Sequence, residues 1–210
     1  MRGAFITVEG IEGVGKTSSI AVIHKSLSAL GQSVRVTREP GGTPLGERIR
    51  ELVLHGGHDS LSAETEALLM FAARAHHVKT LIAPALQRGD WVVCDRFTDA
   101  TFAYQGGGRG LSAEFLRCLR NGVHPELEPD LTLLLDAPVE VGRARIRERK
   151  PDHFEREHAA FFERVRAAYL RLADEQPARM KRIDASQPKE RVEQDLARVL
   201  EQFSIEFRRS

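Results

Sequence analysis

Short apolar runs alternate with longer segments of helical periodicity along this chain. We predict strands at residues 4–8, 34–37, 91–94, 131–135 and 181–183, and helices at residues 18–30, 45–54, 63–87, 139–149, 155–174 and 189–203. The runs at 91–94 and 131–135 are almost continuously apolar, which is typical of strands buried on both faces. Strands that alternate with helices predict an α/β fold in which helices flank a parallel sheet.

Charged residues follow the ends of these predicted strands. They are Glu9, Asp95 with Arg96, Asp136 and Asp184. Because parallel strands end at the same edge of a sheet and ligands bind beyond that edge, we expect these polar groups to converge on a ligand.

The length of 210 residues is that of one compact domain, so we treat residues 1–210 as a single unit. Lys and Arg number 31 and Asp and Glu 30, which gives a formal net charge of +1. This balance argues against broad binding to nucleic acid or to an anionic membrane. We therefore expect a small-molecule partner.

Nothing in the pattern indicates export or a membrane span. No apolar run approaches the ~20 residues of a spanning helix, and Glu9 and Glu12 interrupt the apolar start of the chain. Cys94 and Cys118 fit neither a disulfide framework nor a zinc site, so we expect two buried, reduced thiols. A cytoplasmic protein is predicted.

One motif carries clear chemistry. The chain fits the pattern G-x-x-x-x-G-K-[ST] through Gly10, Ile11, Glu12, Gly13, Val14, Gly15, Lys16 and Thr17, between a predicted strand and a predicted helix. Glycines in such a loop let backbone N–H groups approach phosphate oxygens. Lys16 would reach the β and γ phosphates, and the Thr17 hydroxyl would hold Mg²⁺. The alternative is a simple strand-to-helix turn with a solvated lysine.

The rest of the chain narrows the kind of phosphate-loop protein. We find no N-K-x-D base-reading segment with a D-x-x-G switch, which disfavours a GTPase. Arginines are frequent after the loop: Arg74, Arg96, Arg109, Arg143, Arg145, Arg147 and Arg149. Transfer of a phosphoryl group between two anions requires such neutralising charge. A small-molecule kinase is the interpretation that we favour.

Several further segments together resemble those of bacterial thymidylate kinases. They are residues 9–17 (EGIEGVGKT), 37–43 (TREPGGT), 70–74 (MFAAR), 94–97 (CDRF), 103–110 (AYQGGGRG), 129–133 (PDLTL) and 183–185 (IDA), and they span nearly the whole chain. The resemblance implies a three-layer phosphate-loop fold with a five-stranded parallel sheet and a lid. It also implies phosphorylation of dTMP to dTDP by ATP, with Mg²⁺, in a homodimer.

The resemblance also implies roles for individual residues. Lys16, Arg96 and Asp95 would be catalytic, and Thr17 and Asp95 would lie at the metal. The loop from Gly10 to Thr17 would bind ATP. The residues implied at dTMP are Glu12, Arg38, Arg50, Met70, Phe71, Arg74, Arg96, Thr101, Tyr104 and Gln105. No general base is expected, because the acceptor phosphate is already anionic near neutral pH.

The ring that stacks on thymine is ambiguous in this sequence. Met70 lies four residues and Phe71 three residues before Arg74, and both offsets share a helix face. We favour Phe71 as the stacking ring and Met70 as its neighbour. Packing of either side chain in the core is the alternative.

The predicted lid covers about residues 143–154. In one subclass of the family, lid arginines reach ATP, so Arg149 is the expected catalytic lid residue and Arg147 the second ATP-binding candidate. A solvated basic helix face is the alternative. His153 stands where many relatives carry arginine, which leaves that contact open.

Two other functions remain open. A kinase for a different monophosphate would need another base to fit against Arg74, Thr101 and Gln105. A nucleotide-binding regulatory protein that has lost turnover is a second alternative, but Lys16 and Arg96 are both present, which argues against such a loss.

Overall fold

A single parallel sheet forms the centre of the computed structural model, which describes residues 2–55, 61–146 and 158–208. Its strands are β1 (Phe5–Glu9), β2 (Val34–Arg38), β3 (Trp91–Asp95), β4 (Leu131–Asp136) and β5 (Met180–Asp184), in the spatial order β2-β3-β1-β4-β5. All neighbouring pairs are parallel. The predicted α/β fold with a five-stranded parallel sheet is confirmed.

The central strands are the apolar runs of the sequence. Every residue of β1 and β4 is buried, whereas the edge strands β2 and β5 expose part of their residues. In the register of the sheet, Asp95 lies beside Val8 on one side and beside Arg38 on the other. The ends of β1, β2 and β3 therefore meet at one edge.

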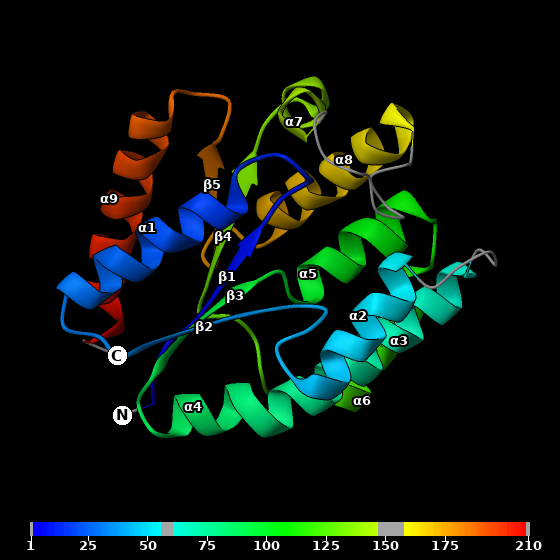
Figure 1. The fold of residues 1–210 in the computed structure, drawn as a ribbon, viewed down its shortest axis with the longest axis horizontal. Helices are drawn as coiled ribbons and strands as arrows, with labels where there is room; N and C mark the ends of the chain where they lie inside the picture. The colour runs from blue at the N-terminus through cyan, green and yellow to red at the C-terminus, as the bar shows by residue number, and fades with distance from the viewer. Residues whose placement is uncertain (1, 56–60, 147–157, 209–210) are drawn as a thin grey trace.

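Helices cover both faces of this sheet (Figure 1). They are α1 (Lys16–Ala29), α2 (Pro44–His55), α3 (Ala63–His77), η1 (Val78–Ile82), α4 (Ala83–Gln87), α5 (Thr98–Thr101), η2 (Phe102–Gly108), α6 (Ala113–Val123), α7 (Val139–Ile146), α8 (Ala159–Glu175) and α9 (Lys189–Phe207). Helices α1 and α9 pack on one face, and α4 and α8 on the other.

The helix predicted at residues 63–87 is present as one helical run, in which η1 is a π-helical segment between α3 and α4. Residues 98–108 and 113–123 are helical although no helix was predicted there. For α6 the sequence carried a signal, because serine is favoured at the start of a helix. In the structure, the Ser112 side chain accepts a hydrogen bond from the Phe115 N–H at 3.2 Å. Residues 147–149 and 155–157 of two predicted helices lie outside the described residues.

The expectation for the two cysteines was half right. Both are free, and Cys94 is buried in β3, but Cys118 is exposed. Cys118 lies two residues after the fully buried Leu116 on α6, which places it on the opposite side of the helix. In the described part of the chain, no helix has both the length and the apolar character needed to cross a bilayer.

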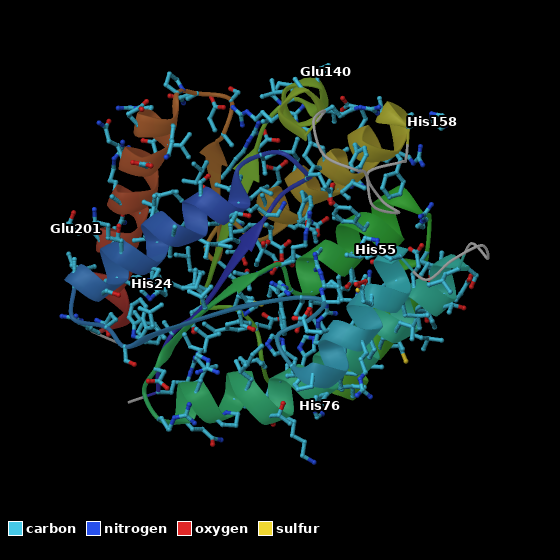
Figure 2. The ribbon with its side chains drawn as sticks, in the orientation of Figure 1. His24, His55, His76, Glu140, His158 and Glu201 are labelled. Atoms are coloured by element: carbon cyan, nitrogen blue, oxygen red, sulfur yellow. The ribbon has the colours of Figure 1, made fainter. Side chains whose placement is uncertain are left out.

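The C-terminal helix contributes a large share of the core. Leu196 and Leu200 of α9 are fully buried against the sheet layer, and Phe203 and Phe207 pack edge-on against Trp91. Glu201 points away from the molecule on the same helix (Figure 2).

We predict that Leu196→Ala lowers the free energy of unfolding by about 3 kcal/mol, because the truncated side chain leaves a cavity in a close-packed layer. Glu201→Ala, an exposed position on the same helix, should change it by less than about 0.5 kcal/mol. Urea unfolding of both variants checks this. Equal losses would mean that α9 is not anchored through Leu196.

Candidate active site

The phosphate loop connects β1 to α1, as the motif predicts. Helix α1 begins at Lys16, directly after Gly15, so its first N–H groups face the loop. Gly13 has a φ of 77° and packs against the backbone of α7: a Cβ at this position would lie 2.1 Å from the Gly142 carbonyl oxygen. Only glycine satisfies both conditions at this position.

A cavity of about 790 Å³ opens at the carboxyl edge of the sheet, next to this loop. The predicted site residues that line it are Glu12, Gly13, Gly15, Lys16, Thr17, Arg38, Arg50, Met70, Arg74, Asp95, Arg96, Thr101, Tyr104 and Gln105. Of the expected edge residues, Asp136 instead pairs with Arg166 and Arg182, and Asp184 accepts hydrogen bonds from Ser186. The structure therefore brings together most of the predicted site, but not Asp136 or Asp184.

Some predicted residues do not line the cavity. Gly10, Ile11 and Val14 belong to the loop without facing the cavity, and Phe71 lies behind it. The lid arginines Arg147 and Arg149, together with His153, lie outside the described residues. Of the predicted lid, only residues 143–146 are described, at the end of α7.

Arg96 occupies the centre of the site in a left-handed backbone conformation, with φ at 67°. Its Nη1 donates to the Gly10 carbonyl at 3.0 Å, and its Nη2 donates to Glu12 Oε1 at 2.8 Å. The guanidinium lies over the Tyr104 ring, and the Tyr104 hydroxyl donates to the other oxygen of Glu12 at 2.6 Å. The carboxylate of Glu12 inside the loop is therefore balanced by Arg96 and Tyr104.

Lys16 is held inside the loop that it belongs to. Its Nζ donates to the carbonyl oxygens of Gly10 and Ile11 at 3.1 and 2.8 Å. Burial and, to a smaller extent, the nearby Arg96 lower the pKa of Lys16 from 10.5 to about 8, against the opposing effect of Asp95. Additional negative charge beside the ammonium group would raise this pKa again.

Asp95 and Thr17 offer oxygen atoms to a cation. Asp95 Oδ1 is buried and has no hydrogen-bond partner among the described residues, and both residues line the cavity. Such an atom needs a hydrogen-bond donor, a water molecule or a cation. Within the described ranges, no group of three or more His, Cys, Asp or Glu side chains could hold a metal. The pair fits Mg²⁺, which keeps several waters and uses one or two protein oxygens.

Arg74 is the most buried cation of the site. Its Nε donates to Glu39 Oε2 at 2.7 Å, and its Nη2 donates to the Phe97 carbonyl and to Thr101 Oγ1, both at 3.1 Å. Its remaining nitrogen, Nη1, is buried and has no partner within the described part of the chain. Since Arg74 lines the cavity, this arginine retains one donor for a ligand.

The structure corrects the choice between Met70 and Phe71. Met70 lines the cavity, whereas Phe71 is buried behind Arg74 with its ring 4.7 Å from the guanidinium carbon. Around the helix these two positions lie on either side of Arg74, and Phe71 is on the side that packs against Leu116 of α6. The preference for Phe71 as the base-facing side chain was wrong.

Glu39 is a buried carboxylate whose role in the site the sequence did not reveal. It holds Arg74 through one oxygen, and the other lies 2.9 Å from His77 Nδ1. Burial alone would raise the pKa of Glu39, but Arg74 and His77 outweigh it, so the pKa lies below its ordinary value of 4.5. His77 in turn contacts Thr37 at the end of β2, which ties α3 to the sheet. The neighbouring His76 lies on the outer side of α3 (Figure 2).

Two other arginines line the cavity near α2. Arg50 is half-buried and donates to the Pro40 carbonyl at 3.1 Å, and Arg38 forms an exposed ion pair with Glu47 at 2.9 Å. Gln105 donates to the buried Glu66, which also pairs with Arg109.

Tyr169 is a further residue that the sequence did not place in the site, and Glu9, which was expected to converge on the ligand, is instead buried behind the cavity wall. The Tyr169 hydroxyl donates to Glu9 at 2.7 Å and also lies 3.4 Å from Arg96 Nη1. Burial and, to a smaller extent, Asp99 raise the pKa of Glu9 from 4.5 to about 7, against the opposing effect of Arg96. Tyr169 comes from α8, far along the chain, and no motif around it marked it.

A second cavity of about 270 Å³ lies beside the phosphate loop. Gly15, Ser18 and Gln187 line it, and Arg145 lines both cavities. The Arg145 guanidinium donates to the Ala185 carbonyl at 3.2 Å, so the segment after β5 is held next to the loop.

We predict that Glu39→Gln lowers the free energy of unfolding by about 3 kcal/mol at pH 7, because it leaves a buried guanidinium without its countercharge. The lowered pKa of Glu39 means that its contribution is present above pH 4.5 and is lost as the pH falls. The difference between the two proteins should therefore shrink on acidification. Glu47→Gln, at an exposed ion pair, is the control and should have little effect. A constant difference across the acid range would contradict the assignment.

Comparison with known proteins agrees with this geometry. The family model described as thymidylate kinase matches residues 8–196. A thymidylate kinase of Methylobacillus flagellatus is 53% identical over 97% of this chain and 99% of its own length. That of Pseudomonas savastanoi pv. phaseolicola is 52% identical over the whole of both chains. The crystal structure of thymidylate kinase from Ehrlichia chaffeensis has a TM-score of 0.77 at 31% identity, covering 95% of this chain and 99% of that one. The chain belongs to the thymidylate kinase family.

Proposed function

We propose that this chain carries out the reaction of its family, the transfer of the γ-phosphoryl group of ATP to dTMP, inside the cavity of about 790 Å³. One observation supports this most directly. The same cavity is lined by the phosphate loop and by Arg74, a buried arginine with one nitrogen that has no partner among the described residues. A site for a triphosphate and a donor suited to a nucleobase carbonyl thus share one space.

ATP would occupy the loop end of the site. The N–H groups at the start of α1 and the ammonium group of Lys16 would hold its phosphates. The adjoining cavity of about 270 Å³ would receive the adenosine, with Arg145 at the boundary between the two spaces. Arg147 and Arg149 remain candidates for ATP contacts from the lid.

Thr17 and Asp95 are the residues that would hold Mg²⁺. Both residues line the cavity next to Lys16, and the buried Asp95 Oδ1 has no hydrogen-bond partner in the described part of the chain. When bound there, Mg²⁺ would neutralise charge on the phosphates of ATP.

dTMP would bind at the opposite side of Arg96 from ATP. Arg38 and Arg50 would neutralise its phosphate, and Met70 would pack against the thymine ring. Arg74 would donate its free Nη1 to a thymine carbonyl, while Thr101 and Gln105 complete the wall around the base. A buried donor left without an acceptor is costly, so a base without that carbonyl should bind poorly.

The transfer itself requires positioning and charge more than proton movement. Arg96 lies between the phosphate loop and the acceptor residues, where its guanidinium would stabilise the charge that is shared by both phosphates in the transition state. Such an arrangement needs no general base. We also propose a cytoplasmic location for the protein, since its reaction consumes ATP.

A homodimer is the assembly that we propose. Helices α2 and α3 pack side by side (Figure 1) and carry three exposed leucines, Leu45, Leu52 and Leu68. Leu45 and Leu52 are seven residues apart and therefore share one face of α2. A second copy of the chain would cover this leucine face.

We predict a clear preference for dTMP when ADP release is measured with ATP, Mg²⁺ and, in turn, dTMP, dUMP, UMP, CMP, GMP and AMP. Arg74→Lys should raise KM for dTMP by about 10- to 100-fold, since a lysine cannot hold Glu39 and the base at once. Arg198→Lys on the exposed side of α9 is the control. Faster turnover of another monophosphate would overturn the substrate assignment.

We also predict that the protein has the mass of two chains in light scattering. Leu52→Glu should reduce it to one chain, because an exposed leucine in an interface would become a buried charge. Leu30→Glu, at another exposed leucine that lies outside the leucine face, should remain at two chains. A single-chain mass for the unchanged protein would exclude the homodimer.

A further inference from the structure

The carboxylate of Glu9 lies beneath the active site and is fully buried at the end of β1. Its Oε1 accepts the backbone N–H of Phe97 at 2.7 Å, and its Oε2 accepts the hydroxyl of Tyr169 at 2.7 Å. Neither Glu9 nor Tyr169 lines the cavity, so a bound nucleotide would not be their direct partner.

Tyr169 contacts the Arg96 side chain directly, and Glu9 is linked to that side chain through Tyr169. The Tyr169 hydroxyl lies 3.4 Å from Arg96 Nη1, so a single oxygen links the buried carboxylate to the guanidinium. The other contacts of that guanidinium, with Gly10 and Glu12, come from the phosphate loop. Outside the loop, the Tyr104 ring of η2 lies 4.8 Å from the guanidinium carbon, and the Tyr169 hydroxyl of α8 is the oxygen that contacts Nη1. The Tyr169 hydroxyl therefore opposes movement of Nη1 away from the loop.

The backbone on both sides of Arg96 is also tied to β1. The Arg96 N–H donates to the Val8 carbonyl at 3.0 Å, and the following N–H, that of Phe97, donates to Glu9. Arg96 has a φ of 67°, a left-handed conformation that is strained for a residue with a side chain. These hydrogen bonds hold the turn that directs the side chain into the cavity.

We propose that Glu9 and Tyr169 are positioning residues that fix the backbone turn and the guanidinium of Arg96 for phosphoryl transfer. The proposal rests on the proposed role of Arg96 between the two phosphates. A displacement of about 1 Å in such a group can cost about 100-fold in rate, whereas substrate affinity depends mainly on other contacts. Loss of either positioning residue should therefore lower kcat and leave KM almost unchanged.

Tyr169→Phe tests this by the removal of one oxygen atom from the full-length protein. We expect kcat to fall about tenfold, with KM for dTMP and for ATP within about twofold of the unchanged protein. The control is Thr7→Val, which removes an equally buried hydroxyl from β1, where Thr7 Oγ1 lies 2.7 Å from Thr132 Oγ1. Thr7→Val should lower the unfolding temperature without lowering kcat.

A combination of variants separates this inference from the role of Arg96. Arg96→Lys alone should lower kcat. Adding Tyr169→Phe to it should lower kcat no further, because the Tyr169 hydroxyl would then have no guanidinium to position. Glu9→Gln should likewise lower kcat, and its effect should not add fully to that of Tyr169→Phe.

Each outcome decides one question. If Arg96→Lys keeps normal kcat, the proposed role of Arg96 is wrong. If Arg96→Lys is slow but Tyr169→Phe keeps normal kcat, or loses stability alone as Thr7→Val does, the positioning inference is wrong. The positioning inference would also be wrong if Tyr169→Phe lowered kcat tenfold in the Arg96→Lys protein as well, since the Tyr169 hydroxyl would then act independently of Arg96.

Discussion

Repulsion among cations is the constraint on which this site depends. The cavity gathers Lys16, Arg38, Arg50, Arg74 and Arg96 on its walls. Two like charges ~4 Å apart repel by about 4 kcal/mol in the partly screened surroundings of a protein. Glu12, Glu39 and Glu47 each pair with one of the arginines, and Lys16 relies on backbone carbonyls and has a pKa lowered to about 8. The carboxylates allow the cations to remain close before any nucleotide arrives.

These ion pairs differ in burial, and the difference separates two kinds of arginine. Arg74 and Glu39 are 2% and 4% exposed, and Glu39 has His77 as a second partner, so water has little access to this pair. Arg96 and Glu12 are 16% and 17% exposed and lie on the cavity wall, where a phosphate can compete for the guanidinium. A fixed arginine with one free nitrogen is suited to base recognition. An arginine whose partner can be exchanged is suited to charge that develops during the reaction.

The sequence predicts those parts of the molecule that depend on local pattern. The central strands and the phosphate loop are local features, and they lie where the apolar runs and the glycine spacing predict them. Tyr169 could not be found in this way, because it reaches Glu9 across 160 residues and no local pattern encodes that contact. The choice between Met70 and Phe71 failed for a related reason: helical periodicity places both near Arg74, and only the packing of Phe71 against α6 decides which of them lines the cavity.

The phosphate loop is also fixed by a contact that involves no side chain. Gly13 and Gly142 pack backbone to backbone, and a Cβ on Gly142 would lie 2.4 Å from the Glu12 carbonyl oxygen. Helix α7 therefore rests directly on the loop segment that carries Glu12, the partner of Arg96. Through this contact, the position of α7 determines the position of the loop, and the loop in turn determines where Glu12 holds the guanidinium. Tyr169 of α8 reaches the same guanidinium from the other side. Helices α7 and α8 thus both contribute to the geometry of Arg96, although neither is adjacent to it in the sequence.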